Sequence, residues 1–242
     1  MSSAMYKKPS IFKRITLVVE HLPIVWASTA LLQCSLDGSQ APDPSLPGCY
    51  INSSPERSTT LFDMDKLGIP HEQRAMFQTA NRRVRDYMYG DKYDPSHDYE
   101  HIQRVVALAQ HLYLGEQDRN LAWASTVDLL IVWLACMFHD VGEPKYREDA
   151  KTQEQVICEI LQQCGVSDAT ATKVAFIAKA VSFTYELTHR DEIRTLIPEY
   201  PELALVQDAD RLDALGAIGT VRASVFGGAN EVRKKQTIHA AI

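Results

Sequence analysis

The sequence lacks the marks of a disulfide-stabilised, membrane-spanning or duplex-binding protein. Its 5 cysteines form no Cys-x-x-Cys pair, and an odd number cannot all pair within one chain, so we expect a reducing compartment and a cytoplasmic protein. The apolar stretch from Ile15 to Leu36 is interrupted by Glu20, His21 and Pro23, which argues against a stable membrane span. A net charge of −6 provides no basic field for duplex nucleic acid.

Two other patterns are also missing. Period-two alternation of apolar and polar residues is scarce, which argues against strands. The Gly227-Gly228 pair has neither the Lys-Ser/Thr ending nor the preceding strand of a phosphate-binding loop. Residues 37–60 are rich in Pro, Ser, Gly and Asp and indicate a linker that cannot order itself by burial. We therefore divide the chain into a poorly ordered N-terminal extension over 1–60 and one folded domain over 61–242.

Helical periodicity dominates the rest of the chain and predicts an all-α domain of about six helices. Gly90 and Gly115 are suitable stop signals for the first two helices, and Ser167 is a suitable cap for the fifth. Residues 188–198 are expected to form a loop. The predicted helices cover Pro70–Tyr89, His97–Leu114, Asn120–Phe138, Glu148–Cys164, Ser167–Val181 and Pro201–Phe226.

Three short patches hold histidines and aspartates inside or beside apolar runs, where an unpaired polar side chain would cost several kcal/mol. On the second predicted helix, His101 shares an apolar stripe with Val105, Leu108 and Leu112. Two imidazoles and two carboxylates that converge on one divalent cation would remove this cost and create a hydrolytic centre. The patches are His97-Asp98-Tyr99-Glu100-His101-Ile102-Gln103-Arg104-Val105, Phe138-His139-Asp140-Val141-Gly142 and Gln207-Asp208-Ala209-Asp210-Arg211-Leu212-Asp213-Ala214-Leu215-Gly216.

These patches resemble the signature of the HD-domain metal-dependent phosphohydrolase superfamily, and in particular a subgroup of small single-domain HD hydrolases. The signature is a His, a His-Asp doublet and a final Asp on the helices of an all-α bundle. The stretch from Gln207 to Gly219 matches the subgroup almost letter for letter. The resemblance covers residues 73–228 and says nothing about residues 1–60. It implies an HD-domain helical bundle with the metal ligands His101, His139, Asp140 and Asp210.

Two questions about the metal site have alternative answers: which aspartate is the fourth ligand, and how many metal ions are bound. Asp208 is the rival of Asp210, and both cannot easily point at one ion because a helix turns about 100° per residue. The resemblance favours Asp210, which stands in the family's Ala-Asp-x-Leu context. Only His189 lies between the doublet and the last Asp, which is too few imidazoles for a second metal site, so we expect one ion. The donor set suits Mn²⁺, Fe²⁺, Co²⁺, Ni²⁺ or Zn²⁺, and Mg²⁺ is also open.

Further polar residues near these motifs are candidates for acting on a substrate. Cations beside the metal would hold phosphate oxygens, and a carboxylate would take the proton from the attacking water. Arg104 could instead brace a ligand carboxylate, and any of these residues could equally be surface charge near a site. The candidates are Arg104, Glu143, Lys145 and Asp98 for catalysis, and His97 and Arg211 for substrate binding.

The resemblance implies a hydrolase that uses metal-activated water on a phosphomonoester or phosphodiester. The expected substrate is a nucleotide or another small phosphorylated metabolite. The alternative is a metal- or nucleotide-binding HD module with impaired catalysis. Two departures from the family keep this alternative open: the chain stops at Ile242, where members usually continue with further helices, and Val181 stands where many relatives carry His. The intact ligand set favours the enzyme, and the oligomeric state stays open.

Overall fold

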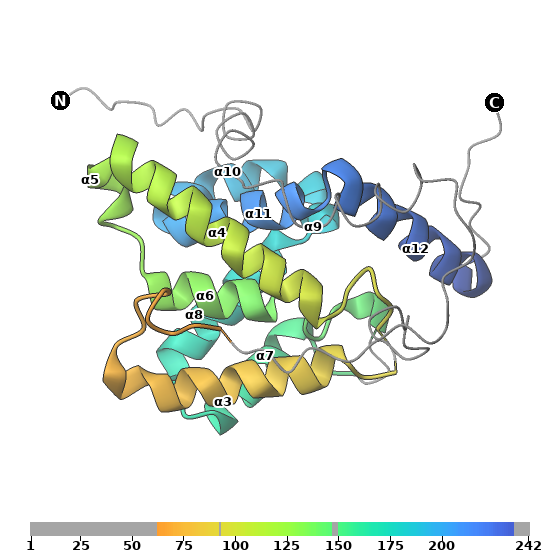
Figure 1. The fold of residues 1–242 in the computed structure, drawn as a ribbon, viewed down its shortest axis with the longest axis horizontal. Helices are drawn as coiled ribbons and strands as arrows, with labels where there is room; N and C mark the ends of the chain where they lie inside the picture. The colour runs from red at the N-terminus through yellow and green to blue at the C-terminus, as the bar shows by residue number, and fades with distance from the viewer. Residues whose placement is uncertain (1–61, 92, 147–149, 235–242) are drawn as a thin grey trace, which may run out of the picture. The chain divides into compact units, whose positions relative to one another are not determined.

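The structure, a computed structural model, describes residues 62–91, 93–146 and 150–234, which belong to one compact unit (Figure 1). This part of the chain contains ten α-helices, one 3-10 turn and no strand, which confirms the predicted all-α class. The predicted extension over 1–60 lies outside the described residues. No helix within the described ranges is both long and apolar enough to cross a membrane.

The longest helices are α3, α4 and α12, with 18, 21 and 19 residues. A 3-10 turn, η1, over Pro144–Tyr146 follows α6. The α-helices are α3 His71–Met88, α4 Tyr99–Arg119, α5 Leu121–Ala124, α6 Leu129–Phe138, α7 Gln153–Gln163, α8 Asp168–Val181, α9 Phe183–Thr188, α10 Arg190–Glu199, α11 Pro201–Asp213 and α12 Gly216–Lys234.

Polar caps set the starts of the helices around the core. The Asp98 side chain caps α4 by accepting a hydrogen bond from the backbone N–H of His101 at 2.9 Å. Asp128 caps α6 in the same way, and Ser167 caps α8 as predicted. Each cap satisfies a backbone N–H that has no partner within its helix, so the start of the helix is well defined.

The described residues contain more helices than the six or so predicted, because long predicted segments are divided. Asn120 caps the short helix α5, and a second cap at Asp128 starts α6 after a turn. The loop predicted over 188–198 is largely helix α10, with Pro198 close to its C-terminal end. The last predicted helix is divided into α11 and α12. The division lies at Gly216, which has a φ of +66°, a conformation that glycine adopts readily.

Two helix boundaries also differ from the prediction. Helix α4 continues past Gly115 to Arg119, because an isolated glycine costs only about 1 kcal/mol inside a helix that packing supports. Helix α7 starts at Gln153 rather than at Glu148, because Thr152 and Gln155 form a capping box there.

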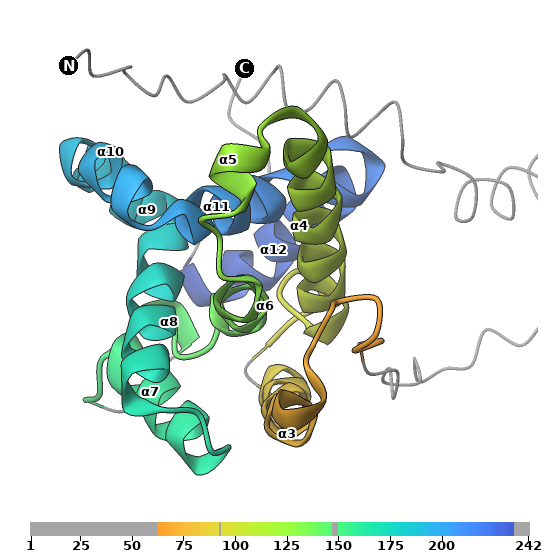
Figure 2. The same cartoon turned by 90° about the vertical axis from the view of Figure 1, so that its left-hand side faces the viewer.

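The core is built around α6, a helix that is apolar on all sides. Every residue from Ile131 to Phe138 is buried, as expected for a helix without a polar face. Helix α6 packs against α3, α4, α8 and α11, and Figure 2 shows it nearly end-on between them. His139 and Asp140 follow directly at its C-terminal end, so the doublet lies inside the bundle.

Helix α11 brings the third patch to the first one. It packs along α4 and also contacts α6 and α8. All residues from Pro201 to Ala209 are buried, which places the following turn of α11 over the core. The three patches predicted from sequence therefore lie on helices that pack against one another.

Gly219 in α12 lies so close to the end of α11 that a side chain has no room there. A Cβ atom at this position would lie 2.2 Å from the backbone carbon and oxygen of Ala214. Gly219→Ala is therefore expected to lower the free energy of unfolding by about 1–3 kcal/mol, the usual cost of overpacking. The measurement is urea denaturation of the purified variant.

Gly228→Ala on the same helix is the matched control, since nothing lies within 4 Å of its Cβ position. Alanine is the better helix former, so this substitution should raise the free energy of unfolding by about 0.5–1 kcal/mol. Equal effects of the two substitutions would contradict the close approach of α12 to Ala214.

Candidate metal centre

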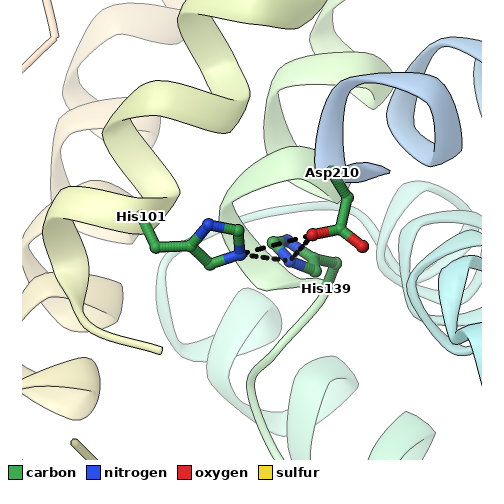
Figure 3. Close-up of side chains that lie close together, drawn as sticks. All are labelled: His101, His139 and Asp210. Atoms are coloured by element: carbon green, nitrogen blue, oxygen red, sulfur yellow. Dashed lines mark hydrogen bonds and ion pairs between the residues drawn. The ribbon is translucent and has the colours of Figure 1, made fainter. Parts of the chain in front are cut away.

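The three sequence patches meet where α4, the C-terminal end of α6 and α11 come together (Figure 3). The Nε2 atoms of His101 and His139 face each other at 3.2 Å. The Oδ1 atom of Asp210 lies 3.4 Å from the Nε2 atom of His101 and 3.5 Å from that of His139. The Oδ2 atom of Asp140 lies 3.4 Å from both nitrogens. The structure thus brings together all four residues that were predicted as metal ligands.

This cluster is buried on three sides and opens at Asp210. His101, His139 and Asp140 expose 0%, 4% and 5% of their surface. The side chain of Asp210 is 30% exposed. Of the four residues, Asp210 therefore has by far the largest exposed fraction.

The hydrogen bonds of the two Nδ1 atoms determine that each imidazole presents the lone pair of its Nε2 atom to the cluster. The Nδ1–H group of His139 donates to the backbone carbonyl of Cys136 at 2.9 Å. The Nδ1–H group of His101 donates to the Oδ2 atom of Asp213 at 2.8 Å. Because a neutral imidazole carries one N–H, both Nε2 atoms then present lone pairs to each other and to two carboxylates. Such a set of lone pairs is stable only around a cation.

The pKa values of these groups have the same physical cause. Burial alone would lower the pKa of His101, but the carboxylates of Asp140, Asp210 and Asp213 outweigh it and raise that pKa to about 10. The pKa of His139 is raised in the same way by Asp140 and Asp210. Burial opposes ionisation of Asp140 and Asp210, yet the two imidazoles hold the pKa of each carboxyl well below its usual range. The carboxylates thus favour positive charge at the position between the two imidazoles.

The residues present fit a divalent metal ion. Ligand atoms of His101, His139 and Asp210 all lie within 4.8 Å of one another. The Oδ2 atom of Asp140 is buried and has no hydrogen-bond partner, a costly state that coordination would remove. Imidazole nitrogens with carboxylate oxygens form a donor set typical of first-row divalent metals. Asp208 is also buried in α11, but it is not part of this group of ligand atoms among the described residues.

Asp213 is the residue at this site that the sequence reasoning missed. Its side chain is 3% exposed and is held by hydrogen bonds or ion pairs to three groups. These are the Nδ1–H of His101, the guanidinium of Arg104 through two bonds of 2.7 and 3.1 Å, and Arg222, whose Nη1 lies 3.0 Å away. Asp213 lies three residues after Asp210, so their shared helix face was a signal that could have indicated it.

Two of the predicted catalytic residues have structural contacts around the cluster. The guanidinium of Arg104 donates a hydrogen bond to the carboxylate of Asp213. This contact matches the bracing role considered for Arg104, although Asp213 is not one of the predicted metal ligands. Asp98 is the cap of α4, and its carboxylate is held by the N–H of His101. Burial, the larger influence, raises the pKa of Asp98 despite that hydrogen bond. Lys145 lies in the η1 turn, and its side chain is outside the described part of the chain.

Two cavities lie next to each other, since Phe226 of α12 lines both. One, of about 550 Å³, adjoins Asp210 and is lined by His97, Phe183, Arg211 and Arg222. The other, of about 660 Å³, is lined by Glu143, Gln153, Lys179 and Tyr185. The ring of His97 lies 6.1 Å from that of His101, and Arg211 forms an ion pair with Glu186. The predicted residues His97 and Arg211 thus share the cavity beside Asp210, and Glu143 lines the other.

Comparison with known proteins places this arrangement in a family. Residues 98–215 match the family model of the HD domain, the region that contains all four converging residues. The matched region is an HD domain, which confirms the resemblance seen in the sequence.

A relative with a matching sequence is YpgQ from Bacillus subtilis strain 168, an uncharacterised protein that is 35% identical over 136 residues. The match covers 55% of this chain and 58% of YpgQ, less than two thirds of its length. The crystal structure of YpgQ in complex with ADP is 29% identical, covers 70% of this chain and 72% of that one, and has a TM-score of 0.46. Its selenomethionine form has a TM-score of 0.47 at 29% identity over 69% of this chain and 74% of that one.

Proposed function

We propose that this protein is a metal-dependent phosphohydrolase that acts on a small phosphate ester. The observation that carries the proposal is the pair of imidazole Nε2 atoms, 3.2 Å apart, with a carboxylate oxygen of Asp140 and one of Asp210 beside them. In the proposal, His101, His139, Asp140 and Asp210 hold one divalent ion. When bound, such an ion acts as a Lewis acid and lowers the pKa of a coordinated water.

The residues around the cluster would divide the remaining work between orientation and substrate binding. Asp213 and the carbonyl of Cys136 keep the two imidazoles turned with Nε2 inward. The cavity beside Asp210 would hold the ester, with Arg211 and His97 as its polar contacts. Arg211 would have to exchange its Glu186 partner for a phosphate oxygen. Glu143, in the neighbouring cavity, is our candidate for accepting the proton of the attacking water.

A nucleotide is the substrate class that we propose. The cavity beside Asp210 has a volume of about 550 Å³, which suits a small organic ligand, and two phenylalanine rings line it together with two arginines. Aromatic rings stack with nucleobases, and guanidinium groups bind phosphates. YpgQ, which is related in sequence, was crystallised with ADP, so ADP belongs in the first panel of compounds.

Metal dependence of hydrolysis tests this proposal. Protein purified without added metal should contain about one divalent ion per chain by mass spectrometry and should hydrolyse p-nitrophenyl phosphate or a nucleotide. Chelation should lower the rate by about 10²–10³-fold and added Mn²⁺ should restore it, because the ion supplies several kcal/mol of transition-state stabilisation.

The control for this experiment is the double variant His139→Ala with Asp140→Ala, which should lose both the metal and the activity. Bound metal without turnover on any ester would favour the alternative, a metal- or nucleotide-binding HD module. Well-folded protein that binds no metal at all would refute the proposed centre.

A further inference from the structure

Helix α12 lies beyond the region that matches the HD family model, yet one of its faces borders the candidate metal centre. The family match ends at residue 215, and α12 starts at Gly216. Gly219, Arg222, Ala223 and Phe226 all line the cavity beside Asp210. Their spacing of three, four and seven residues puts them on the same side of the helix. We propose that α12 is part of the active site and that Arg222 is its positioning residue.

Arg222 joins α12 to two other segments of the site. Its Nε–H donates to the backbone carbonyl of Ser96 at 2.9 Å, and its Nη1 lies 3.0 Å from the Oδ2 atom of Asp213. The side chain is only 11% exposed. A buried guanidinium with two fixed acceptors has little freedom to move, so it holds these acceptors at a set separation.

The contact with Asp213 connects Arg222 to a proposed metal ligand. The same Oδ2 atom that faces Arg222 accepts the hydrogen bond from the Nδ1–H of His101 at 2.8 Å. Arg104 holds Asp213 from the α4 side, and Arg222 holds it from the α12 side. Both arginines therefore help to hold Asp213 in its orientation toward His101. Residues that orient a ligating histidine in this way affect metal affinity by about 10–100-fold.

The contact with Ser96 connects Arg222 to the substrate cavity. Ser96 directly precedes His97, and both residues line the cavity together with Arg222. The ring of His97 also lies 5.4 Å from that of Phe226, on the same face of α12. The guanidinium of Arg222 therefore contacts both Asp213, which orients His101, and Ser96, which is part of the cavity wall. Its loss should weaken metal binding and raise KM together.

The test compares Arg222→Gln with Arg222→Lys and with Val221→Ala. Val221 is the neighbouring residue, is 61% exposed and is no part of the cavity lining, so it is the matched control. Chelator-treated protein is titrated with Mn²⁺ by calorimetry, and KM and kcat are measured with p-nitrophenyl phosphate. Arg222→Gln should weaken Mn²⁺ binding by about tenfold and raise KM. Arg222→Lys, which retains the charge, should recover part of the loss, and Val221→Ala should match the wild type.

An effect confined to stability would overturn the inference. That result would be a folded Arg222→Gln protein with a lower melting temperature but with Mn²⁺ affinity and KM within about twofold of the wild type. If Arg222→Gln does not fold, Arg222→Lys carries the test, and unchanged Mn²⁺ affinity and KM in that variant count against Arg222.

The inference rests on the proposed metal centre but not on the proposed reaction. If the wild type binds Mn²⁺ and hydrolyses no ester, the phosphohydrolase proposal fails, and the Mn²⁺ affinities alone still decide the role of Arg222. If the wild type binds no Mn²⁺ and contains no other divalent ion by mass spectrometry, both proposals fall. If it turns over an ester and Arg222→Gln is unaffected, only the role of Arg222 is refuted.

Discussion

Replacement of Asp210 by asparagine is expected to weaken metal binding by more than about 100-fold, because changes in groups that only orient a ligand already cost about 10–100-fold. Hydrolysis should fall by about 10³-fold at a metal concentration that saturates the wild type. The physical reason is the loss of the carboxylate that lies 3.4 and 3.5 Å from the two facing imidazole nitrogens. Metal titration and steady-state kinetics measure the two effects.

Asp208→Asn is the matched control for this substitution. Asp208 lies two residues earlier on the same helix and is 1% exposed, so the exchange makes the same chemical change in an equally helical setting. Its metal affinity should stay within about threefold of the wild type, well below the cost of disturbing a group that orients a ligand. A loss of metal in Asp208→Asn but not in Asp210→Asn would transfer the ligand role to Asp208.

The second large effect is expected from Asp213→Asn, measured on metal-free protein by urea denaturation. The carboxylate of Asp213 contacts His101, Arg104 and Arg222 at once. Burial opposes its ionisation, but His101 and Arg104 lower the pKa of the carboxyl to about 2. An amide of the same size is neutral and turns an N–H toward one of these donors. The free energy of unfolding should fall by about 3 kcal/mol, as for other buried ion pairs that lose one partner.

An exposed ion pair provides the control for Asp213→Asn. Asp191 lies 3.4 Å from Arg194, and both side chains are largely exposed. Asp191→Asn should therefore lower the free energy of unfolding by at most about 1 kcal/mol, because exposed pairs and exposed charges in a first helical turn contribute little. A similar decrease in the free energy of unfolding in the two variants would mean that the burial of Asp213 does not increase its contribution to stability.

The sequence predicted local features of the fold better than the divisions between helices. The start of α8 and the stripe that buries His101 depend on neighbouring residues, and both agree with the structure. The division at Gly216 depends on a backbone conformation that a helical pattern does not reveal. Helix α10 was missed because Pro198 close to its end favoured a loop in the sequence pattern.

The candidate site shows the same division between local and distant information. The resemblance of three short motifs named the four residues that converge. The hydrogen bond between His101 and Asp213 spans 112 residues, and no pattern within either motif shows it. Arg104 was open to a catalytic or a bracing role, and its position on Asp213 follows from the packing of α4 against α11.

The sequence by itself determined the all-α class, the buried character of the helix before the His-Asp doublet and the residues that converge on the centre. These features follow from composition, helical period and short motifs, which act between neighbours along the chain. Only the tertiary structure decided which imidazole nitrogens face inward, that Asp213 holds His101, and that α12 borders the site through Arg222. Those features depend on distances between segments far apart in sequence, and only the packing of α4, α6, α11 and α12 sets these distances.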